Sequence, residues 1–243
     1  MDYVFFDLDD TLYDQAQPFA FAYRKVFGTR FDTAGPGASP LDVEALFSAS
    51  RRHSEAVFLA SERGEMSMED MYVYRIQKAF EDFGISVSAD ECLRMQAIYA
   101  ASQESAIEVS PTMARVLDWC RENSHPGIIS NGPAEHQLKK IEALRLDRWV
   151  SPEETFISSI VGVAKPDPAI FYLACERCGT SPKRCLYVGD SFKPDVGGAA
   201  AAGMPVVWFN RRHRDEPDGQ GDPVPNWIVE SEKELLGLLP TLA

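Results

Sequence analysis

The feature that most constrains the fold is a short apolar stretch near the start of the chain that runs into acidic residues. Residues 3–6 read Tyr-Val-Phe-Phe, and Asp7, Asp9 and Asp10 follow. The stretch does not alternate polar and apolar residues, so it predicts a strand buried on both faces, as in a parallel sheet. Ligands of open α/β sheets bind at the carboxyl ends of the strands, where these carboxylates lie. Asp-Asp-Thr is also turn chemistry, so this stretch alone leaves a plain turn and a functional site both open.

The remaining chain predicts an α/β sheet with a helical insert. Beyond residue 111, stretches of strand-forming residues alternate with helical stretches, which is typical of a doubly wound parallel sheet with right-handed crossovers. The strands predicted there cover residues 127–130, 155–158, 184–188, 205–209 and 227–229. The fold class is therefore expected to be α/β, with the first strand separated from the rest of its sheet.

The insert shows helical spacing of its apolar residues and no convincing strand. A break rich in Gly and Pro interrupts it at residues 35–40. Its predicted helices cover residues 15–27, 41–62, 67–83 and 89–107. We therefore expect two domains, an α/β catalytic core made of residues 1–14 and 108–243 and a separate all-helical cap made of residues 15–107.

Composition narrows the classes of partner. The chain carries a formal net charge of −13 over 243 residues, which argues against nucleic acid or a membrane surface, because polyanion binding needs clustered Lys and Arg. A small anionic substrate stays compatible, since it senses the local field and any bound cation. No apolar run approaches the roughly 20 residues of a membrane span, and the first residues lack the basic leader of a signal peptide, so we expect a cytoplasmic protein. The lone CxxC pair, Cys175 and Cys178, predicts ordinary thiols and no zinc site.

Polar residues follow four of the predicted strands. Because the carboxyl ends of parallel strands meet at one edge of a sheet, we expect these side chains to lie together. Three carboxylates suit Mg²⁺, a hydroxyl and an amide before a helix suit phosphate, and a lysine adds positive charge. One carboxylate can then attack phosphorus while a second transfers protons. The residues concerned are Asp7, Asp9, Ser130, Asn131, Lys165, Asp190 and Asp195.

The segments that carry these residues resemble the four motifs of the haloacid dehalogenase superfamily, in their usual order. They are Asp7-Leu8-Asp9-Asp10-Thr11, Ile129-Ser130-Asn131-Gly132, Lys165-Pro166-Asp167-Pro168 and Gly189-Asp190-Ser191-Phe192-Lys193-Pro194-Asp195. With a helical insert after the first strand, the chain is similar to the phosphatase branch, which implies a Rossmann-like core and a cap.

The resemblance also implies a role for each motif residue. Asp7 is expected to be the nucleophile and Asp9 the general acid/base, while Ser130 and Lys165 hold the phosphoryl group. Mg²⁺ is expected to be ligated by Asp7, Asp190 and the backbone carbonyl of Asp9, with Asp195 at or just outside its shell. Asp10 matches no catalytic position and is expected to shape the turn.

The residue two positions past the nucleophile separates the reaction classes. Relatives that cleave carbon–halogen bonds lack the second aspartate, because a halide needs no proton, so Asp9 favours phosphoryl transfer. A phosphoglycolate or sugar-phosphate phosphatase and a phosphosugar mutase remain alternatives within the superfamily. A phospho-aspartate signalling module is the alternative from another class, but such modules are single domains of about half this length and have no cap.

The substrate class is expected from similarities in the cap and around the second motif, which are less specific than the four motifs. The cap segment with Gly64 and Ser67, followed by Arg75, resembles caps of pyrimidine and other nucleoside 5′-monophosphate phosphatases, and so does Ser130–Pro133 with the nearby Gln137. We therefore expect Mg²⁺-dependent hydrolysis of nucleoside 5′-monophosphates, with Arg75 and Asn131 in substrate binding. A surface role is the alternative for Arg75. We expect a small phosphorylated substrate as partner and a monomer or weak dimer.

One basic cluster lies outside these motifs. Residues 210–214 read Asn-Arg-Arg-His-Arg, and acidic residues follow directly. The pattern predicts local salt pairing within this loop and no polyanion site.

Overall fold

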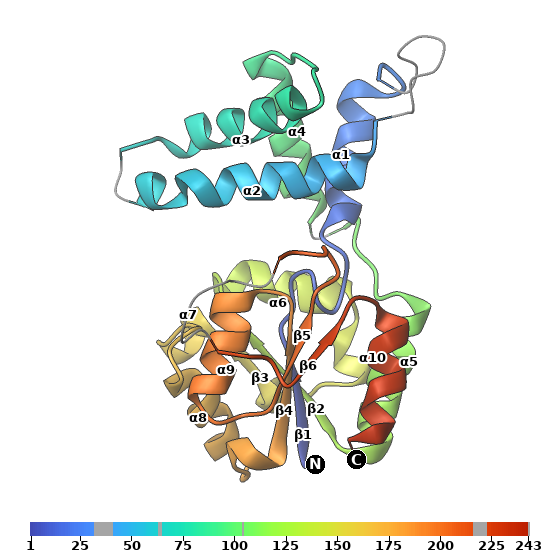
Figure 1. The fold of residues 1–243 in the computed structure, drawn as a ribbon, viewed down its shortest axis with the longest axis vertical. Helices are drawn as coiled ribbons and strands as arrows, with labels where there is room; N and C mark the ends of the chain where they lie inside the picture. The colour runs from blue at the N-terminus through green and yellow to red at the C-terminus, as the bar shows by residue number, and fades with distance from the viewer. Residues whose placement is uncertain (32–40, 63–64, 104, 216–222, 243) are drawn as a thin grey trace. The chain divides into compact units, whose positions relative to one another are not determined.

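The computed structural model describes residues 1–31, 41–62, 65–103, 105–215 and 223–242 (Figure 1). The chain divides into two compact units. One combines Met1–Asp14 with Glu108–Ala243, and the other is Gln15–Ile107. The break predicted at residues 35–40 and Gly64 of the cap segment lie outside the described residues.

The first unit is built on a six-stranded sheet whose strand pairs are all parallel, in the order β3-β2-β1-β4-β5-β6. This confirms the predicted doubly wound sheet. β1 is central, with Phe6 in register with Ile128 of β2 and Val188 of β4. The end of β1 therefore lies between the ends of two strands that carry predicted site residues. The strands are β1 Tyr3–Phe6, β2 His125–Ser130, β3 Thr155–Ile157, β4 Cys185–Gly189, β5 Val206–Phe209 and β6 Trp227–Val229.

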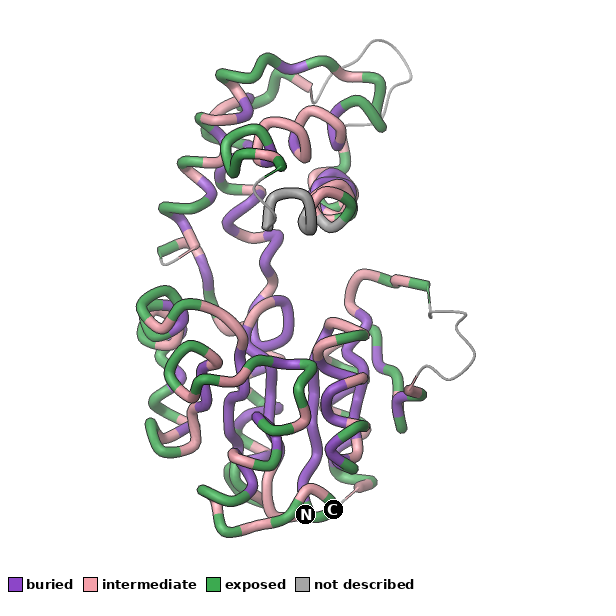
Figure 2. Tube along the Cα trace, turned by 90° about the vertical axis from the view of Figure 1, so that its left-hand side faces the viewer, coloured by how far each residue is buried: buried purple, intermediate pink, exposed green. Residues whose placement is uncertain are grey.

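Helices cover both faces of this sheet. Figure 1 shows α8 and α9 on one side and α5 and α10 on the other. Figure 2 shows the strands as a buried layer between helices whose outer surfaces are exposed. Rings from several elements fill the core on one face, among them Phe171, Tyr187 and Trp208. The helices are α5 Pro111–Asn123, α6 Ala134–Ala143, α7 Ser158–Val161, α8 Ala169–Arg177, α9 Gly198–Ala201 and α10 Glu232–Leu238, with 3-10 turns at Leu146–Arg148, Pro152–Glu154, Pro182–Arg184 and Leu239–Thr241.

The helical stretch between β4 and β5, for which the sequence predicts one helix over 195–202, begins with a wider turn. A π-helical stretch, Phe192–Gly197, precedes the short helix α9. Its wide hydrogen bond runs from the N–H of Val196 to the carbonyl of Ser191, at 3.4 Å. Single π turns of this kind often occur at functional sites. The turn is followed by a close approach, because a Cβ on Gly198 would lie 3.1 Å from backbone atoms of Pro166, and glycine is therefore required there.

The second unit is helical throughout the residues that the structure describes. Ser67 caps α3 by accepting the N–H of Asp70, and Ser88 forms a capping box with Glu91 at the start of α4. Aromatic residues on different helices, Phe19 and Phe47 among them, pack into a separate core. The helix predicted over 89–107 ends earlier, at Ser102. The helices are α1 Ala16–Phe27, α2 Val43–Glu62, α3 Met68–Asp82 and α4 Ala89–Ser102.

Neither unit contains, among its described residues, a helix long and apolar enough to cross a lipid bilayer.

Candidate active site

The acidic residues that follow β1 begin at the carboxyl end of the sheet, where Asp7 is buried. Asp7 continues the strand, since its N–H donates to the carbonyl of Val188 at 2.9 Å, and the residue is 7% exposed. The chain then turns tightly, with Asp10 in the left-handed region at a φ of 60°. Short polar side chains tolerate this conformation, so Asp10 shapes the turn while Asp7 faces the ends of the neighbouring strands.

Lys165 joins two carboxylates from different strand ends. Its ammonium nitrogen lies 2.6 Å from Asp7 Oδ1 and 2.6 Å from Asp195 Oδ1, and it donates to the hydroxyl of Tyr187 at 2.8 Å. Asn131 fixes the lysine backbone, because its amide accepts the Lys165 N–H at 2.9 Å and donates to the Lys165 carbonyl at 2.8 Å. The second and third motifs are therefore locked together.

A third carboxylate, that of Asp190, lies close to the two that pair with Lys165. One oxygen from each of Asp7, Asp190 and Asp195 lies within 4.8 Å of the others, and all three residues are buried. A Cβ on Gly189 would lie 2.5 Å from Asp195 Cγ, so only glycine lets β4 approach this carboxylate. Hard carboxylate oxygens in a compact group are the donors that Mg²⁺ prefers. The donor set therefore fits a divalent cation.

The charges of the cluster are unbalanced. Burial raises the pKa of Asp7 to about 7 although Lys165 acts in the opposite direction. Burial and the neighbouring carboxylates, Asp10 foremost, raise the pKa of Asp190 well above its ordinary value. For Lys165, burial disfavours the ammonium, but Asp195 and Asp7 outweigh it and raise the lysine pKa. Lys165 and Arg214, whose Nη2 lies 3.6 Å from Asp190 Oδ2, give the three acids two basic partners, and a bound cation would supply further positive charge.

A hydroxyl at the end of β2 lacks a hydrogen-bond partner. Ser130 is 1% exposed, and its Oγ meets no donor or acceptor in the described part of the chain. Leaving a buried hydroxyl unsatisfied costs about 1–3 kcal/mol, so a position of this kind favours a ligand that supplies the partner. The adjoining helix α6 begins at Ala134, and the N-terminus of a helix attracts anions.

Asp9 is held by side chains that sequence reasoning missed. Lys140 and Gln137 of α6 both donate to its carboxylate, as does the hydroxyl of Tyr13. Burial would raise the pKa of Asp9, but the ammonium of Lys140 and the hydrogen bonds outweigh it and lower that pKa. From the sequence, Gln137 is only a point of resemblance to nucleotidases. Nothing in the sequence around Lys140 indicates that its side chain reaches Asp9.

The arginines of the loop after β5 reach acids beyond their own loop. Each pairs with a carboxylate from a distant part of the chain, as Arg214 does with Asp190 at 3.6 Å, while Glu216 and Asp218, two of the acids that follow them, lie outside the described residues. Arg212 donates to both oxygens of Asp10 and also pairs with Asp14. Arg211 pairs with Glu232 at 2.9 Å. The sequence places Asp10 and Arg212 about 200 positions apart, so no local pattern could have linked them.

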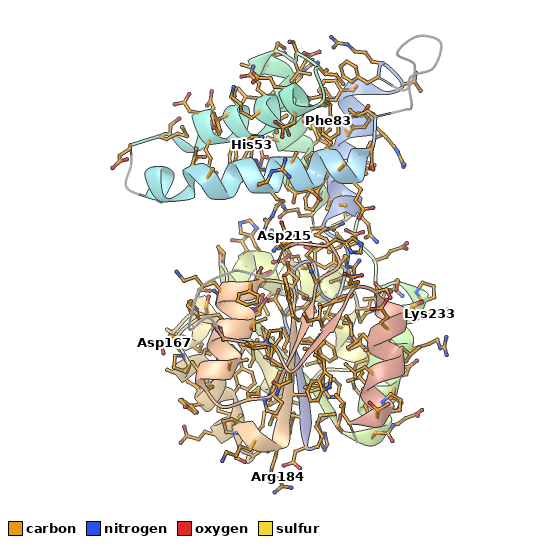
Figure 3. The ribbon with its side chains drawn as sticks, viewed as in Figure 1. His53, Phe83, Asp167, Arg184, Asp215 and Lys233 are labelled. Atoms are coloured by element: carbon orange, nitrogen blue, oxygen red, sulfur yellow. The ribbon has the colours of Figure 1, made fainter. Side chains whose placement is uncertain are left out.

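Figure 3 places Arg184, which precedes β4, at the end of the sheet where strands begin. Asp7, Ser130 and Asp190 lie where β1, β2 and β4 end, so the candidate site is at the opposite end of the sheet from Arg184.

Arg75 belongs to the helical unit and is described there alone. It lies on α3, donates to Gln96 at 2.5 Å, and its guanidinium is 5.3 Å from the ring centre of Tyr72 and 5.9 Å from that of Tyr99. Its Nε has no partner among the described residues. The substrate-binding roles predicted for Arg75 and Asn131 stay predictions.

Comparisons with known proteins agree with this geometry. A family model described as haloacid dehalogenase-like hydrolase matches residues 1–203. Pyrimidine 5′-nucleotidase YjjG of Escherichia coli is 37% identical over 130 residues, which is 53% of this chain and 56% of that protein, so the match spans little more than half of this relative. Glyceraldehyde 3-phosphate phosphatase of Methanopyrus kandleri is 27% identical, over 99% of this chain and 97% of its own.

Solved structures share the fold. A HAD-hydrolase from Bacillus subtilis, YfnB, solved with magnesium bound, superposes with a TM-score of 0.67 and covers 98% of each chain. Its sequence is 21% identical, which is evidence for the fold alone.

Proposed function

This chain belongs to the family of haloacid dehalogenase-like hydrolases, and on that premise we propose that it is a phosphatase of small phosphomonoesters. One observation carries the proposal. Asp7, Lys165, Asp190 and Asp195 form a single buried cluster at the carboxyl end of the sheet, and the hydroxyl of Ser130, which has no partner among the described residues, lies at the same end of β2. Phosphoryl transfer depends on positioning and on charge stabilisation, and this cluster supplies both.

In the proposed mechanism Asp7 attacks the phosphorus atom of the substrate. The bond from Asp7 to phosphorus forms as the bond from phosphorus to the leaving oxygen breaks, and Asp9 donates a proton to that oxygen. Asp9 then takes a proton from a water molecule that attacks the aspartyl-phosphate, which releases phosphate and restores Asp7. Lys165 and Ser130 hold the phosphoryl oxygens during both steps.

We propose Mg²⁺ as the cation of this site, held by Asp7, Asp190 and the backbone carbonyl of Asp9, with Asp195 at or beside its shell. A bound divalent cation neutralises the charge that develops on the phosphoryl oxygens. The fit rests on the compact group of hard carboxylate oxygens and on the excess of these three acids over their two basic partners, Lys165 and Arg214.

Asp9 separates this proposal from a dehalogenase. A halide leaves without a proton, so a second carboxylate beside the nucleophile has no task in that reaction. In this chain Asp9 is fixed by donors from α6 and from the turn itself. These donors fix the position of the carboxyl group that would transfer the proton to an alkoxide leaving group.

Two substrate classes are proposed. Nucleoside 5′-monophosphates come first, because the E. coli relative at 37% identity is named a pyrimidine 5′-nucleotidase. Triose and sugar phosphates come second, because the relative named a glyceraldehyde 3-phosphate phosphatase matches nearly the whole chain. We assign Arg75 and Asn131 to substrate binding within this proposal. The cytoplasmic location and the monomeric or weakly dimeric state also remain proposals.

The test is release of inorganic phosphate from a panel of nucleoside monophosphates, sugar phosphates and phosphoglycolate, with and without Mg²⁺. We expect Mg²⁺-dependent hydrolysis of at least one member by the unaltered protein and loss of that activity in Asp7→Asn. Lys139→Met, on the exposed side of α6, is the control that should keep the activity. If no phosphomonoester is hydrolysed, or if Asp7→Asn matches the unaltered protein, the proposal is wrong.

A further inference from the structure

A buried lysine on α6 has the carboxylate of Asp9 as its acceptor. Lys140 Nζ lies 2.7 Å from Asp9 Oδ1 and 3.0 Å from Oδ2. The lysine side chain is 7% exposed, although lysine is rarely buried unless it is paired. Removing an ammonium from water costs several kcal/mol that good geometry has to offset. The ion pair with Asp9 therefore offsets the cost of burying the Lys140 ammonium.

Gln137 lies one turn earlier on the same face of α6, since residues three apart on a helix are neighbours. Its Nε2 donates to Asp9 Oδ2 at 3.0 Å and to the Asn131 carbonyl at 2.6 Å. Tyr13 donates to the other oxygen, Oδ1. Both oxygens of Asp9 are thus held from two sides, while 23% of its side chain stays exposed and open to a ligand.

We propose that Lys140 and Gln137 are positioning residues that aim the carboxyl group of Asp9 at the leaving oxygen of the substrate. This inference rests on the phosphatase function proposed above. A general acid must lie within hydrogen-bond reach of the atom that it protonates, and misplacement by about 1 Å can cost about 10²-fold in rate. Four hydrogen bonds fix Asp9 more tightly than a plain turn requires.

A purely structural role makes a different prediction. If Lys140 only balanced a buried charge, its loss would lower activity on all substrates by one common factor, through the fraction of folded protein. A positioning role acts on the protonation of the leaving oxygen. Its loss therefore slows substrates with a poor leaving group, such as an alcohol, and spares substrates whose leaving group departs without a proton.

The experiment compares two substrates in each variant. One is p-nitrophenyl phosphate, with a good leaving group, and the other is uridine 5′-monophosphate or glyceraldehyde 3-phosphate, whichever the unaltered protein hydrolyses. The variants are Lys140→Met and Gln137→Leu, with Lys139→Met as the matched control, because that neighbouring lysine is exposed and pairs with Glu135. The measured quantity is kcat/KM with Mg²⁺, and its ratio between the two substrates does not depend on the active fraction.

In Lys140→Met we expect kcat/KM for the alcohol ester to fall about 10²-fold and that for p-nitrophenyl phosphate to fall less than about threefold. Gln137→Leu should change the ratio in the same direction by a smaller factor, and Lys139→Met should leave it unchanged. An equal fall for both substrates, or no fall, overturns the assignment. If the unaltered protein hydrolyses neither p-nitrophenyl phosphate nor any ester of the panel used to test the proposed function, that function itself is wrong and this assignment falls with it.

Discussion

Replacing Lys165 by methionine tests the electrostatics of the cluster. The substitution keeps most of the side-chain volume and removes the ammonium that lies 2.6 Å from both Asp7 and Asp195. The two carboxyl side chains are 9% and 1% exposed, so water cannot replace the lost partner. Breaking a buried ion pair by removing one partner costs about 3–5 kcal/mol.

The cost should depend on pH in a defined direction. Burial already raises the pKa of Asp7 to about 7 with the lysine present, and loss of Lys165 removes the effect that lowers it. A carboxyl group whose pKa is higher in the folded than in the unfolded state loses stability as pH rises between the two values. The destabilisation by Lys165→Met should therefore be larger at pH 8 than at pH 6.

Urea unfolding of the metal-free protein gives the magnitude. All four tryptophans lie in the α/β unit, at positions 119, 149, 208 and 227, so their fluorescence reports on that unit alone. With an m-value of about 1–3 kcal/mol/M, a loss of about 3 kcal/mol lowers the midpoint by about 1–3 M. Lys139→Met controls for the loss of a positive charge. If the midpoint of Lys165→Met equals that of the control at pH 8, the argument from buried charge is wrong.

Three further predictions concern single positions. Ser130→Ala should lower kcat about 10²-fold, as loss of one donor to a developing oxyanion does. It should leave the urea midpoint unchanged, because the hydroxyl has no hydrogen-bond partner in the described structure. A lowered midpoint would contradict this prediction. Gly189→Ala should displace Asp195, since the added Cβ would lie 2.5 Å from Asp195 Cγ. Isothermal titration calorimetry should then show Mg²⁺ binding weakened at least about tenfold, or by about 1.4 kcal/mol. An unchanged affinity for Mg²⁺ would refute the close approach of residue 189 to Asp195. Burial raises the pKa of Cys92 and Cys120 to about 12, so both stay as unreactive thiols at pH 8. Mass spectrometry after iodoacetamide treatment should find these cysteines labelled only in urea. Labelling of either cysteine in the native protein at pH 8 would contradict the burial.

Much of the fold could be predicted because its signals are local. Each strand is a short apolar run, and the position of Asp7 at the end of the first run follows from the pattern itself. The order of the strands brings the predicted site residues together, since β1 lies between β2 and β4. The π-helical turn before α9 was missed, because one wide hydrogen bond leaves no mark in the spacing of apolar residues.

The side chains that tune the site could not be predicted. Lys140 meets Asp9 across 131 positions, and Arg212 meets Asp10 across 202. Such pairs depend on how a helix or a loop packs against the sheet edge, and charge patterning along the chain reports only neighbours. For the same reason the arginines after β5 were predicted to pair with the acids beside them. Tyr187 lies in a stretch that the sequence predicts only as a strand, residues 184–188, although its hydroxyl accepts a hydrogen bond from Lys165.

The central claim, that Asp7 carries the phosphoryl group, can be tested by trapping the intermediate. The protein would be mixed with Mg²⁺ and a substrate from the panel, quenched in acid within milliseconds, and digested for mass spectrometry. We predict one phosphoryl group on the peptide that contains Asp7, absent from the Asp7→Asn variant and from protein quenched after turnover is complete. Rapid release of phosphate with no phosphorylated peptide, or with the group on another residue, would contradict the account.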